Sequence, residues 1–182
     1  MYSEIFIFST RALKKDNHRK EFLRMTWNEK STQKHILRPA KTSDADAVME
    51  CVHEAFSYYI ERMGLKPGPM LMDYVHEIIE HQVSVVEIRD QIIGVLVMKI
   101  KEEGFLLDVI AVNPHFQGIG IGKLMLEFAE SEAQRQGYTS IYLYTHEKMT
   151  ENQALYAKIG YVEYDRRLEM GLARIYMRKV LP

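Results

Sequence analysis

The chain has 182 residues, of which 47% are hydrophobic, and its formal net charge at pH 7 is -1. This length and hydrophobic content are sufficient for one compact domain with a sizeable core. A nearly neutral chain lacks the strongly basic domain or stripe that is typical of nucleic-acid binders, so we expect no nucleic-acid partner.

The cysteine and hydropathy patterns indicate the compartment. Cys51 is the single cysteine, which excludes an internal disulfide and a cysteine-based zinc site and fits a reducing environment. No apolar run approaches the roughly 18 residues of a membrane-spanning helix, and the run IFIF near the start is too short for the core of a signal peptide. We therefore expect a soluble, cytoplasmic protein with no membrane partner.

Residues 1–34 differ in charge from the rest of the chain. They hold eight Lys or Arg against four Asp or Glu, whereas the remaining residues hold sixteen against twenty-one. The segment has no clear hydrophobic periodicity, and Met25 is an alternative start. We predict an N-terminal extension over residues 1–34, which need not pack, and a single domain over residues 35–182.

The first expected element of that domain is a strand over residues 35–38, which Pro39 ends or places at an edge. Thr42 or Ser43 is then expected to cap a helix. Asp46 lies three residues beyond Ser43, which is the spacing of a capping box.

The following stretch changes from a helical to an extended period. Apolar residues recur every three or four positions over residues 47–59, and a Gly- and Pro-rich break leads to a second helix over about residues 70–81. Three apolar, β-branched segments then follow, separated by short polar turns that are typical of an antiparallel meander. They are VSVVEIR, IIGVLVMKI and FLLDVIAV, residues 83–89, 92–100 and 105–112.

The second half of the domain alternates helices and strands. A helix over about residues 119–136 ends at Gly137, and a strand follows over residues 140–146. A short helix over residues 151–160 ends at Gly160 and precedes two last strands. The order βααβββαβαββ predicts a mixed α/β fold.

Three glycines stand just before the longest helix of the second half, in the run QGIGIGK. A P-loop needs four residues between its first glycine and the Gly-Lys pair, then a hydroxyl for magnesium, but three residues separate Gly118 from Gly122 and Leu124 follows Lys123. A dinucleotide fingerprint needs a glycine three positions after Gly120, where Lys123 stands, and a preceding parallel unit. We reject both interpretations.

Helix physics offers another role for these glycines. A helix N-terminus presents unpaired backbone N–H groups and a partial positive charge, so it can hold a pyrophosphate by main-chain hydrogen bonds. Glycines let the backbone approach that anion because they have no Cβ. A Gly-rich turn without a ligand remains the alternative.

The motif also resembles a known family. Gln117, Gly120 and Gly122 fit the signature Arg/Gln-x-x-Gly-x-Gly/Ala of the GNAT superfamily of N-acetyltransferases, after an apolar strand that ends in IAVNP. ENQALYAKIGYVE resembles the family's later helix, with a tyrosine and a following Gly-aromatic pair. The resemblance covers about residues 35–182. It implies a GNAT-like fold, with a central, mostly antiparallel twisted sheet of about seven strands flanked by about four helices, and acetyl-CoA as the acyl donor without a metal.

The resemblance also implies the cofactor site. The strand before the glycine loop lends main-chain groups to the pantetheine arm and the thioester carbonyl, while its side chains pack in the core. The loop then holds the pyrophosphate. The implied cofactor-binding residues are Ile110, Ala111, Val112, Gln117, Gly118, Ile119, Gly120, Ile121, Gly122 and Lys123.

Tyr156 matches the family tyrosine that often protonates the departing CoA thiolate. A phenol with a pKa of about 10 keeps its proton at neutral pH, although half-buried packing is the alternative role. Many relatives carry an asparagine seven residues before this tyrosine, where this chain has Met149. Asn152, one helical turn before Tyr156, is therefore predicted to contact the cofactor, unless it caps the helix near Thr150.

The implied reaction is direct attack of an amine on the thioester in a ternary complex. An alkyl ammonium is neutral in only roughly one molecule in 2,500 at pH 7, so a base or water chain must take its proton. Asp108 is the favoured base, because it is embedded in an apolar strand and burial raises the pKa of a carboxyl group. The other candidates are Glu54, Asp73, His76 and Glu77.

The acceptor pocket is the least defined part. Residues 58–74 mix aromatics, Met and charge around a Pro/Gly loop, which suits either a pocket wall or core packing. Four arginines near the end hold a carboxylated acceptor or simply decorate edge strands: Arg166, Arg167, Arg174 and Arg178. We predict an N-acetyltransferase acting on a primary amine of a small molecule, amino acid or peptide. A catalytically silent acyl-CoA sensor or scaffold is the alternative, and a homodimer is left open.

Overall fold

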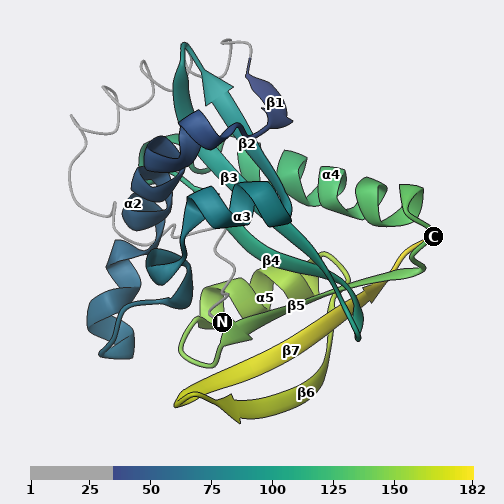
Figure 1. Ribbon diagram of the computed structural model, residues 1–182. Coiled ribbons are helices and arrows are strands. Elements are labelled where there is room, and N and C mark those ends of the chain that lie inside the picture. The colour runs from purple at the N-terminus through teal and green to yellow at the C-terminus, as the bar shows by residue number, and fades with distance from the viewer. Residues whose placement is uncertain (1–34) are drawn as a thin grey trace, which may run out of the picture.

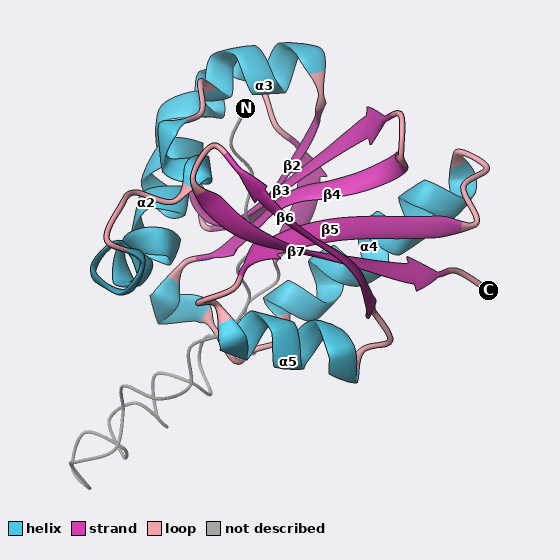
Figure 2. Ribbon diagram, turned by 90° about the horizontal axis from the view of Figure 1, so that it is seen from below, coloured by secondary structure: helices cyan, strands magenta, loops and turns pink. Residues whose placement is uncertain are grey.

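A seven-stranded sheet runs through residues 35–182, which are the residues that this computed structural model describes. Helices α2 and α3 cover one face of the sheet, and α4 and α5 cover the other (Figures 1 and 2). The described residues therefore form the predicted mixed α/β fold with seven strands and four α-helices. The expectations for residues 1–34, including Met25 as a start, lie outside the described residues.

The strands follow the order β1-β2-β3-β4-β5-β7-β6 across the sheet. All neighbouring pairs are antiparallel except β4 and β5, which run parallel. The strand bounds are β1 (Ile36–Pro39), β2 (Gln82–Ile88), β3 (Gln91–Lys101), β4 (Gly104–Val112), β5 (Ser140–His146), β6 (Val162–Glu169) and β7 (Leu172–Val180). The predicted meander is confirmed as β2, β3 and β4.

The helices lie close to their predicted positions. They are α2 (Ala45–Met63), α3 (Tyr74–Glu80), α4 (Ile121–Arg135) and α5 (Thr150–Lys158), with 3₁₀ turns η1 (Thr42–Asp44), η2 (Gly68–Leu71) and η3 (Pro114–Phe116). The second helix was predicted as one segment, but it is divided into η2 and α3. Asp73 causes the division, because its side chain accepts from two backbone N–H groups of the first turn of α3 and so begins a separate helix.

The start of α2 also differs from the prediction. The capping pair is Lys41 with Asp44, not Ser43 with Asp46: the carboxylate of Asp44 accepts from the backbone N–H of Lys41 at 2.7 Å. The same carboxylate receives the guanidinium of Arg38 at 2.7 Å. Because Arg38 is on β1, the cap also fixes the strand to the helix.

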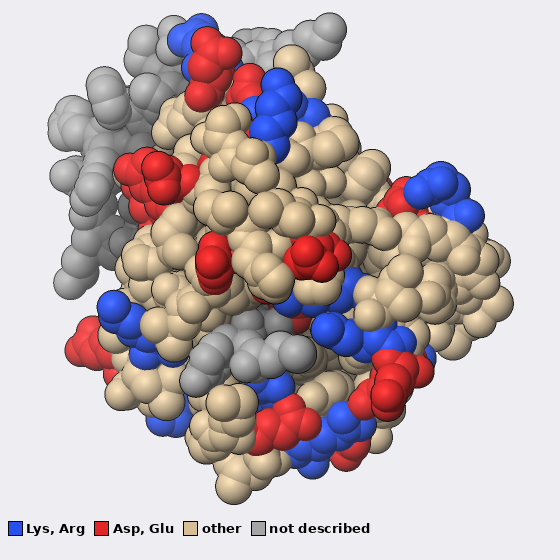
Figure 3. All heavy atoms as spheres, viewed as in Figure 1, with Lys and Arg blue, Asp and Glu red and all other residues tan. Residues whose placement is uncertain are grey.

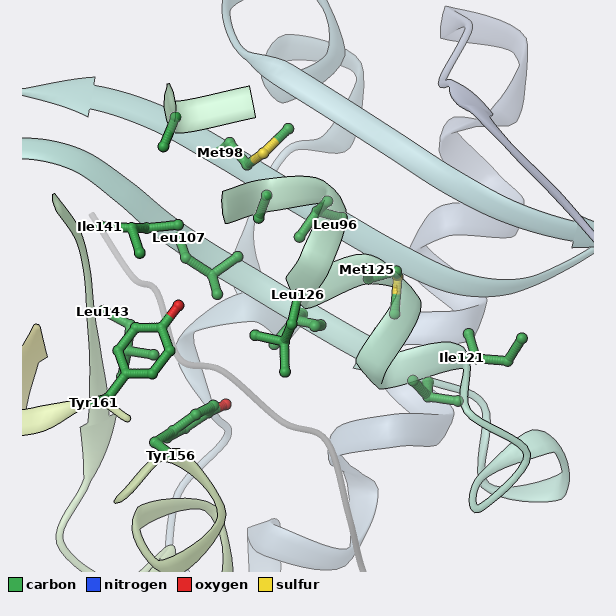
Figure 4. Close-up of a cluster of buried hydrophobic side chains, with 14 of the residues drawn as sticks. Leu96, Met98, Leu107, Ile121, Met125, Leu126, Ile141, Leu143, Tyr156 and Tyr161 are labelled. Carbon is green, nitrogen blue, oxygen red and sulfur yellow. The ribbon is translucent and has the colours of Figure 1, made fainter. Parts of the chain in front are cut away.

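Alternation along the central strands divides the core into two layers. Val95, Val97 and Val109 face α2, whereas Leu96 and Leu107 face α4. Figure 4 shows the second layer, with Met125 and Leu126 of α4 packed over the sheet. The helix approaches the sheet closely at Gly94 of β3, where a Cβ would lie 3.2 Å from the Ile121 side chain.

A β-bulge interrupts β4 at Asp108. Val97 pairs with Val109 and Met98 pairs with Leu107, so Asp108 has no opposite residue on β3. The extra residue turns Asp108 and Val109 toward the same face of the sheet, the face that α2 and α3 cover. The bulge thus directs one carboxylate into an otherwise apolar layer.

Candidate active site

The parallel strands β4 and β5 separate soon after they meet. They pair at two positions, Phe105 with Ile141 and Leu106 with Tyr142, although β4 continues to Val112 and β5 to His146. Beyond those pairs, the edge of β4 that faces β5 has no strand partner among the residues that the structure describes. The predicted cofactor strand residues Ile110, Ala111 and Val112 lie in this separated part and are buried, as expected for side chains in the core.

The glycine loop leads from that strand end into α4. Gly118 and Gly120 have positive φ values of 80° and 95°, a conformation that glycine adopts without a Cβ penalty. Gly120 is the N-cap of α4, and the first helical bond joins the Leu124 N–H to its carbonyl at 3.0 Å. The N–H groups of the three preceding residues, 121–123, therefore have no partner within the helix.

The side chains of the loop lie in the core or in solvent. Ile121 is buried in the core and Ile119 packs at its margin. Lys123 is exposed and lies 3.6 Å from Glu127 one turn along the helix. A Cβ at Gly120 would meet no atom within 4 Å, so the space beside its backbone is open. The contacts predicted at these positions would therefore come from the main chain.

Two side chains anchor the loop to the fold. The Asn113 amide donates to Glu54 of α2, and its oxygen accepts from the His115 N–H at 2.9 Å. The Gln117 amide donates to the Val112 carbonyl at 3.1 Å. Gln117 thus ties the loop to the end of β4, and Glu54, a candidate base, is engaged in holding Asn113.

Tyr156 lies on α5 within the layer between the sheet and α4. Its side chain is fully buried, and its hydroxyl has no hydrogen-bond partner among the described residues. Tyr161 lies beside it, with ring centroids 5.8 Å apart, and the two hydroxyl oxygens point toward the middle of the cluster in Figure 4. Burial raises the pKa of Tyr156 well above its ordinary value, so the phenol keeps its proton.

Asn152 is buried one turn before Tyr156. Its amide lies 3.7 Å from the Met149 sulfur, and the N-cap of α5 is Met149 without a side-chain hydrogen bond. Asn152 therefore does not cap the helix, which removes the alternative role considered for it. Its buried side chain on the same helix as Tyr156 is compatible with the predicted cofactor contact.

Asp108 belongs to a buried group of three charges. The Lys99 ammonium on β3 lies 2.8 Å from Asp108 and 2.8 Å from Glu77 of α3. Burial alone lowers the pKa of Lys99, but Asp108 and Glu77 outweigh that effect and the pKa is raised, so the ammonium is retained. The Tyr144 hydroxyl of β5 donates to the other oxygen of Asp108 at 3.4 Å.

Lys99 was missed at the sequence level, although a signal was present. One lysine interrupts the apolar run IIGVLVMKI, and one aspartate interrupts the next run, FLLDVIAV. Opposite charges that stand alone in two adjacent antiparallel strands are expected to pair if the register brings them together. The remaining base candidates do not belong to this buried group: Asp73 caps α3, and His76 is exposed.

A cavity of about 350 Å³ opens on the opposite face of the sheet from Tyr156. Its apolar wall consists of Leu106, Tyr142, Tyr144 and Tyr176, a cluster separate from the layer under α4. Leu106 and Tyr142 form the last pair before β4 and β5 separate. The cavity and the buried tyrosine therefore lie on opposite faces of the sheet, and the cavity reaches the point where β4 and β5 separate.

Charged residues complete the rim of this cavity: Lys101, Glu103, Glu169 and Arg174. Figure 3 shows acidic and basic side chains side by side over the lower part of this face, where Figure 1 places β6 and β7. Of the four arginines singled out in the sequence, Arg174 lines the cavity. Arg166 pairs with Glu163 on the exposed strand β6 instead.

His146 ends β5 and was also missed from the sequence. It is buried, and its Nδ1 accepts from the Lys148 N–H at 3.2 Å. Burial lowers the pKa of His146, and Glu147 opposes this only in part. The ring is therefore neutral at pH 7, with its other nitrogen carrying the proton.

None of the helices in residues 35–182 is long and apolar enough to cross a membrane. Within the same residues, no group of three His, Cys, Asp or Glu side chains is arranged to hold a metal ion.

Comparisons with known proteins agree with this geometry. Residues 80–163 match the family model of the acetyltransferase (GNAT) domain. Mycothiol acetyltransferase from Jonesia denitrificans is 27% identical over 137 residues, which cover 69% of this chain and 42% of that protein. The chain thus matches less than half the length of this curated relative.

Solved structures share the fold. The PaiA N-acetyltransferase of Thermoplasma acidophilum, solved in complex with coenzyme A, has a TM-score of 0.66 and 18% identity, covering 81% of this chain and 99% of that one. The ribosomal-protein-S18-alanine N-acetyltransferase of Escherichia coli has a TM-score of 0.67 and 17% identity, covering 81% of this chain and 94% of that one. The match of residues 80–163 to the acetyltransferase (GNAT) domain and the likeness to these solved structures show that the chain has the GNAT fold.

Proposed function

We propose that this protein is an N-acetyltransferase that transfers the acetyl group of acetyl-CoA to a primary amine. The observation that carries the proposal is the separation of β4 from β5, with the N-terminus of α4 and a buried phenol on one face of the sheet and a cavity on the other. A donor and an acceptor that enter from opposite faces would meet there. The match of residues 80–163 to the GNAT domain and the relatives' acetyltransferase names support this choice of chemistry.

The chain's own groups would hold the donor without a metal. The N–H groups at the mouth of α4 would bind the pyrophosphate, assisted by the positive end of the helix. The unpaired edge of β4 at residues 110–112 would bind the pantetheine arm through main-chain groups. Asn152, buried beside Tyr156, would contact the same arm.

The chemistry balances with one acid and one base. The amine nitrogen attacks the thioester carbonyl carbon, a C–N bond forms and the C–S bond breaks. Tyr156 would donate its proton to the leaving sulfur, for which its burial, its lack of a hydrogen-bond partner within residues 35–182 and its raised pKa suit it. The tyrosine is then restored from solvent after the products leave.

Asp108 would receive the proton of the acceptor amine, and we infer that it does so through Tyr144. Asp108 does not line the cavity, whereas Tyr144 does, and its hydroxyl lies 3.4 Å from the Asp108 carboxylate. Lys99 and Glu77 would hold that carboxylate in place. Tyr144→Phe should then lower kcat by about tenfold to a hundredfold without weakening acetyl-CoA binding, because it removes the relay and no cofactor contact.

The proposal has a two-part test on the full chain. Calorimetric titration with acetyl-CoA should give one binding event, and a panel of amines with thiol-release detection should reveal turnover. A flat titration of folded protein contradicts the proposal entirely. Binding without turnover for any amine contradicts the enzymatic part and favours an acyl-CoA sensor.

Other expectations remain predictions. The domain boundary at residue 35 is tested by limited proteolysis of the full chain, which should cut before that residue and leave acetyl-CoA binding intact. The homodimer is tested by light scattering, and the cytoplasmic location by fractionation of the source cells.

A further inference from the structure

We propose that the cavity beside the β6–β7 turn selects acceptors with one amino group and an apolar or aromatic body, and that Met170 at the tip of the turn is a specificity-determining residue. This inference rests on the proposed function, because it assigns an acceptor class to the same site. It follows from two features of the cavity wall: its charged groups are already paired within the chain, and apolar surface remains exposed.

The carboxylates of the cavity are already paired. Glu103 receives the Arg167 guanidinium at 2.6 Å, and Glu169 receives that of Arg174 at 2.5 Å. The hydrogen bond from Arg167 holds the pKa of Glu103 below its usual range. An additional ammonium group of a polyamine would have to displace a guanidinium, so the cavity disfavours polycationic acceptors.

The ring faces of the wall are also engaged by cations of the chain. Arg167 lies 4.1 Å from the centre of the Tyr176 ring and Arg174 lies 4.4 Å from that of Tyr144. An aromatic wall can recognise a cationic ligand through these faces, but the protein's own arginines already use that attraction. A ligand in the cavity can therefore contact mainly apolar surface, which Leu106 and the exposed parts of the tyrosine rings provide.

Met170 adds to this apolar surface at the rim. It lines the cavity and is 68% exposed, so its side chain contributes little to the core. Glu169 pairs with Leu172, which makes Met170 and Gly171 a two-residue turn with φ values of 51° and 79°. Such a turn favours Asn, Asp or Gly at its first position, and methionine is disfavoured there.

The chain contains a matched turn away from the cavity. Arg89 and Asp90 join β2 to β3 with φ values of 48° and 63°, so Arg89 occupies the same disfavoured position as Met170. Arg89 does not line the cavity, and β2 is separated from β6 by four strands in the sheet order. Replacing each residue by asparagine relieves the same backbone strain, but only one replacement alters the cavity.

The experiment compares Met170→Asn, Arg89→Asn and the unaltered chain with 2-phenylethylamine, ethylamine and spermidine as acceptors. Both variants should raise Tm, by about 2–4 °C, because asparagine accepts the turn conformation. Met170→Asn should raise the KM for 2-phenylethylamine about fivefold to tenfold and leave the KM for ethylamine within about twofold, because only the larger amine has a body to contact. Arg89→Asn should change neither KM.

The unaltered chain should also prefer 2-phenylethylamine to spermidine by about tenfold or more in kcat/KM. Preference for spermidine, or equal KM changes for both monoamines in Met170→Asn, overturns the acceptor inference. Acetyl-CoA binding without acetylation of 2-phenylethylamine overturns it as well, while the proposed cofactor site stands. Failure of acetyl-CoA to bind overturns the proposed function and this inference with it.

Discussion

Two buried polar groups, on opposite faces of the sheet near the point where β4 and β5 separate, differ in their hydrogen-bond partners. The Tyr156 hydroxyl has no hydrogen-bond partner among the described residues, which typically costs about 1–3 kcal/mol. The Asp108 carboxylate, in contrast, has the Lys99 ammonium at 2.8 Å and the Tyr144 hydroxyl at 3.4 Å. The fold satisfies the carboxylate and leaves the phenol open, which is the arrangement expected if the phenol awaits a ligand and the carboxylate is held in position.

The largest expected effect comes from removing the cation that pairs with Asp108 and Glu77. Lys99→Met leaves two buried carboxylates without their cation, so the free energy of unfolding should fall by about 3–5 kcal/mol. Urea denaturation measures this loss. The control is Lys123→Met, which removes an exposed lysine with an ion pair at 3.6 Å and should cost less than about 0.5 kcal/mol. Equal losses in the two variants would show that the buried group does not hold the layer together.

The second effect tests the role of the Tyr156 hydroxyl. Tyr156→Phe should lower kcat about 10²-fold, because the leaving sulfur loses its acid, while stability stays the same or rises. Tyr161→Phe is the matched control, since its hydroxyl is equally buried and has no partner among residues 35–182. Steady-state kinetics and denaturation of both variants check the comparison. A similar drop in kcat for Tyr161→Phe, or none for Tyr156→Phe, would remove Tyr156 as the acid.

A smaller effect separates the two ends of α4. Gly120→Val and Gly137→Val each force a side chain into a left-handed conformation, at φ values of 95° and 84°, so each should cost about 1–2 kcal/mol of stability. Neither added Cβ would meet an atom within 4 Å. Acetyl-CoA affinity should fall about tenfold in the Gly120 variant alone, since its Cβ occupies the space where the anion would approach. Calorimetry that finds equal losses of affinity at both ends would contradict the backbone site.

The smallest effect concerns pH. Burial lowers the pKa of His146 and of His81, so the unfolded chain binds protons more readily than the folded one below about pH 6.5. The free energy of unfolding should therefore decrease as the pH falls from 6.5 toward 5. His146→Gln should flatten part of this slope in denaturation curves measured at several pH values. A slope that is unchanged in the variant would show that His146 does not contribute.

The positions of Tyr156 and the glycine loop were predictable from the sequence, whereas the partners of Asp108 were not. The glycine loop and Tyr156 are local patterns, in which spacing along the chain fixes the position of each residue on a turn or helix. The prediction of Asp108 as a base did not include Lys99: each strand carries one isolated charge, but the register that brings the two together is not set by any local pattern. The cavity is more remote still, since it combines β4, β5 and the β6–β7 turn through their register.

The central claim is that acetyl-CoA is held by main-chain groups where β4 and β5 separate. Amide hydrogen exchange of the full chain, with and without acetyl-CoA, tests it most directly. We predict slower exchange over residues 118–124 and at the end of β4, residues 109–112, with little change at the β2–β3 turn. Protection confined to other segments, or no protection at saturating acetyl-CoA, would contradict the account.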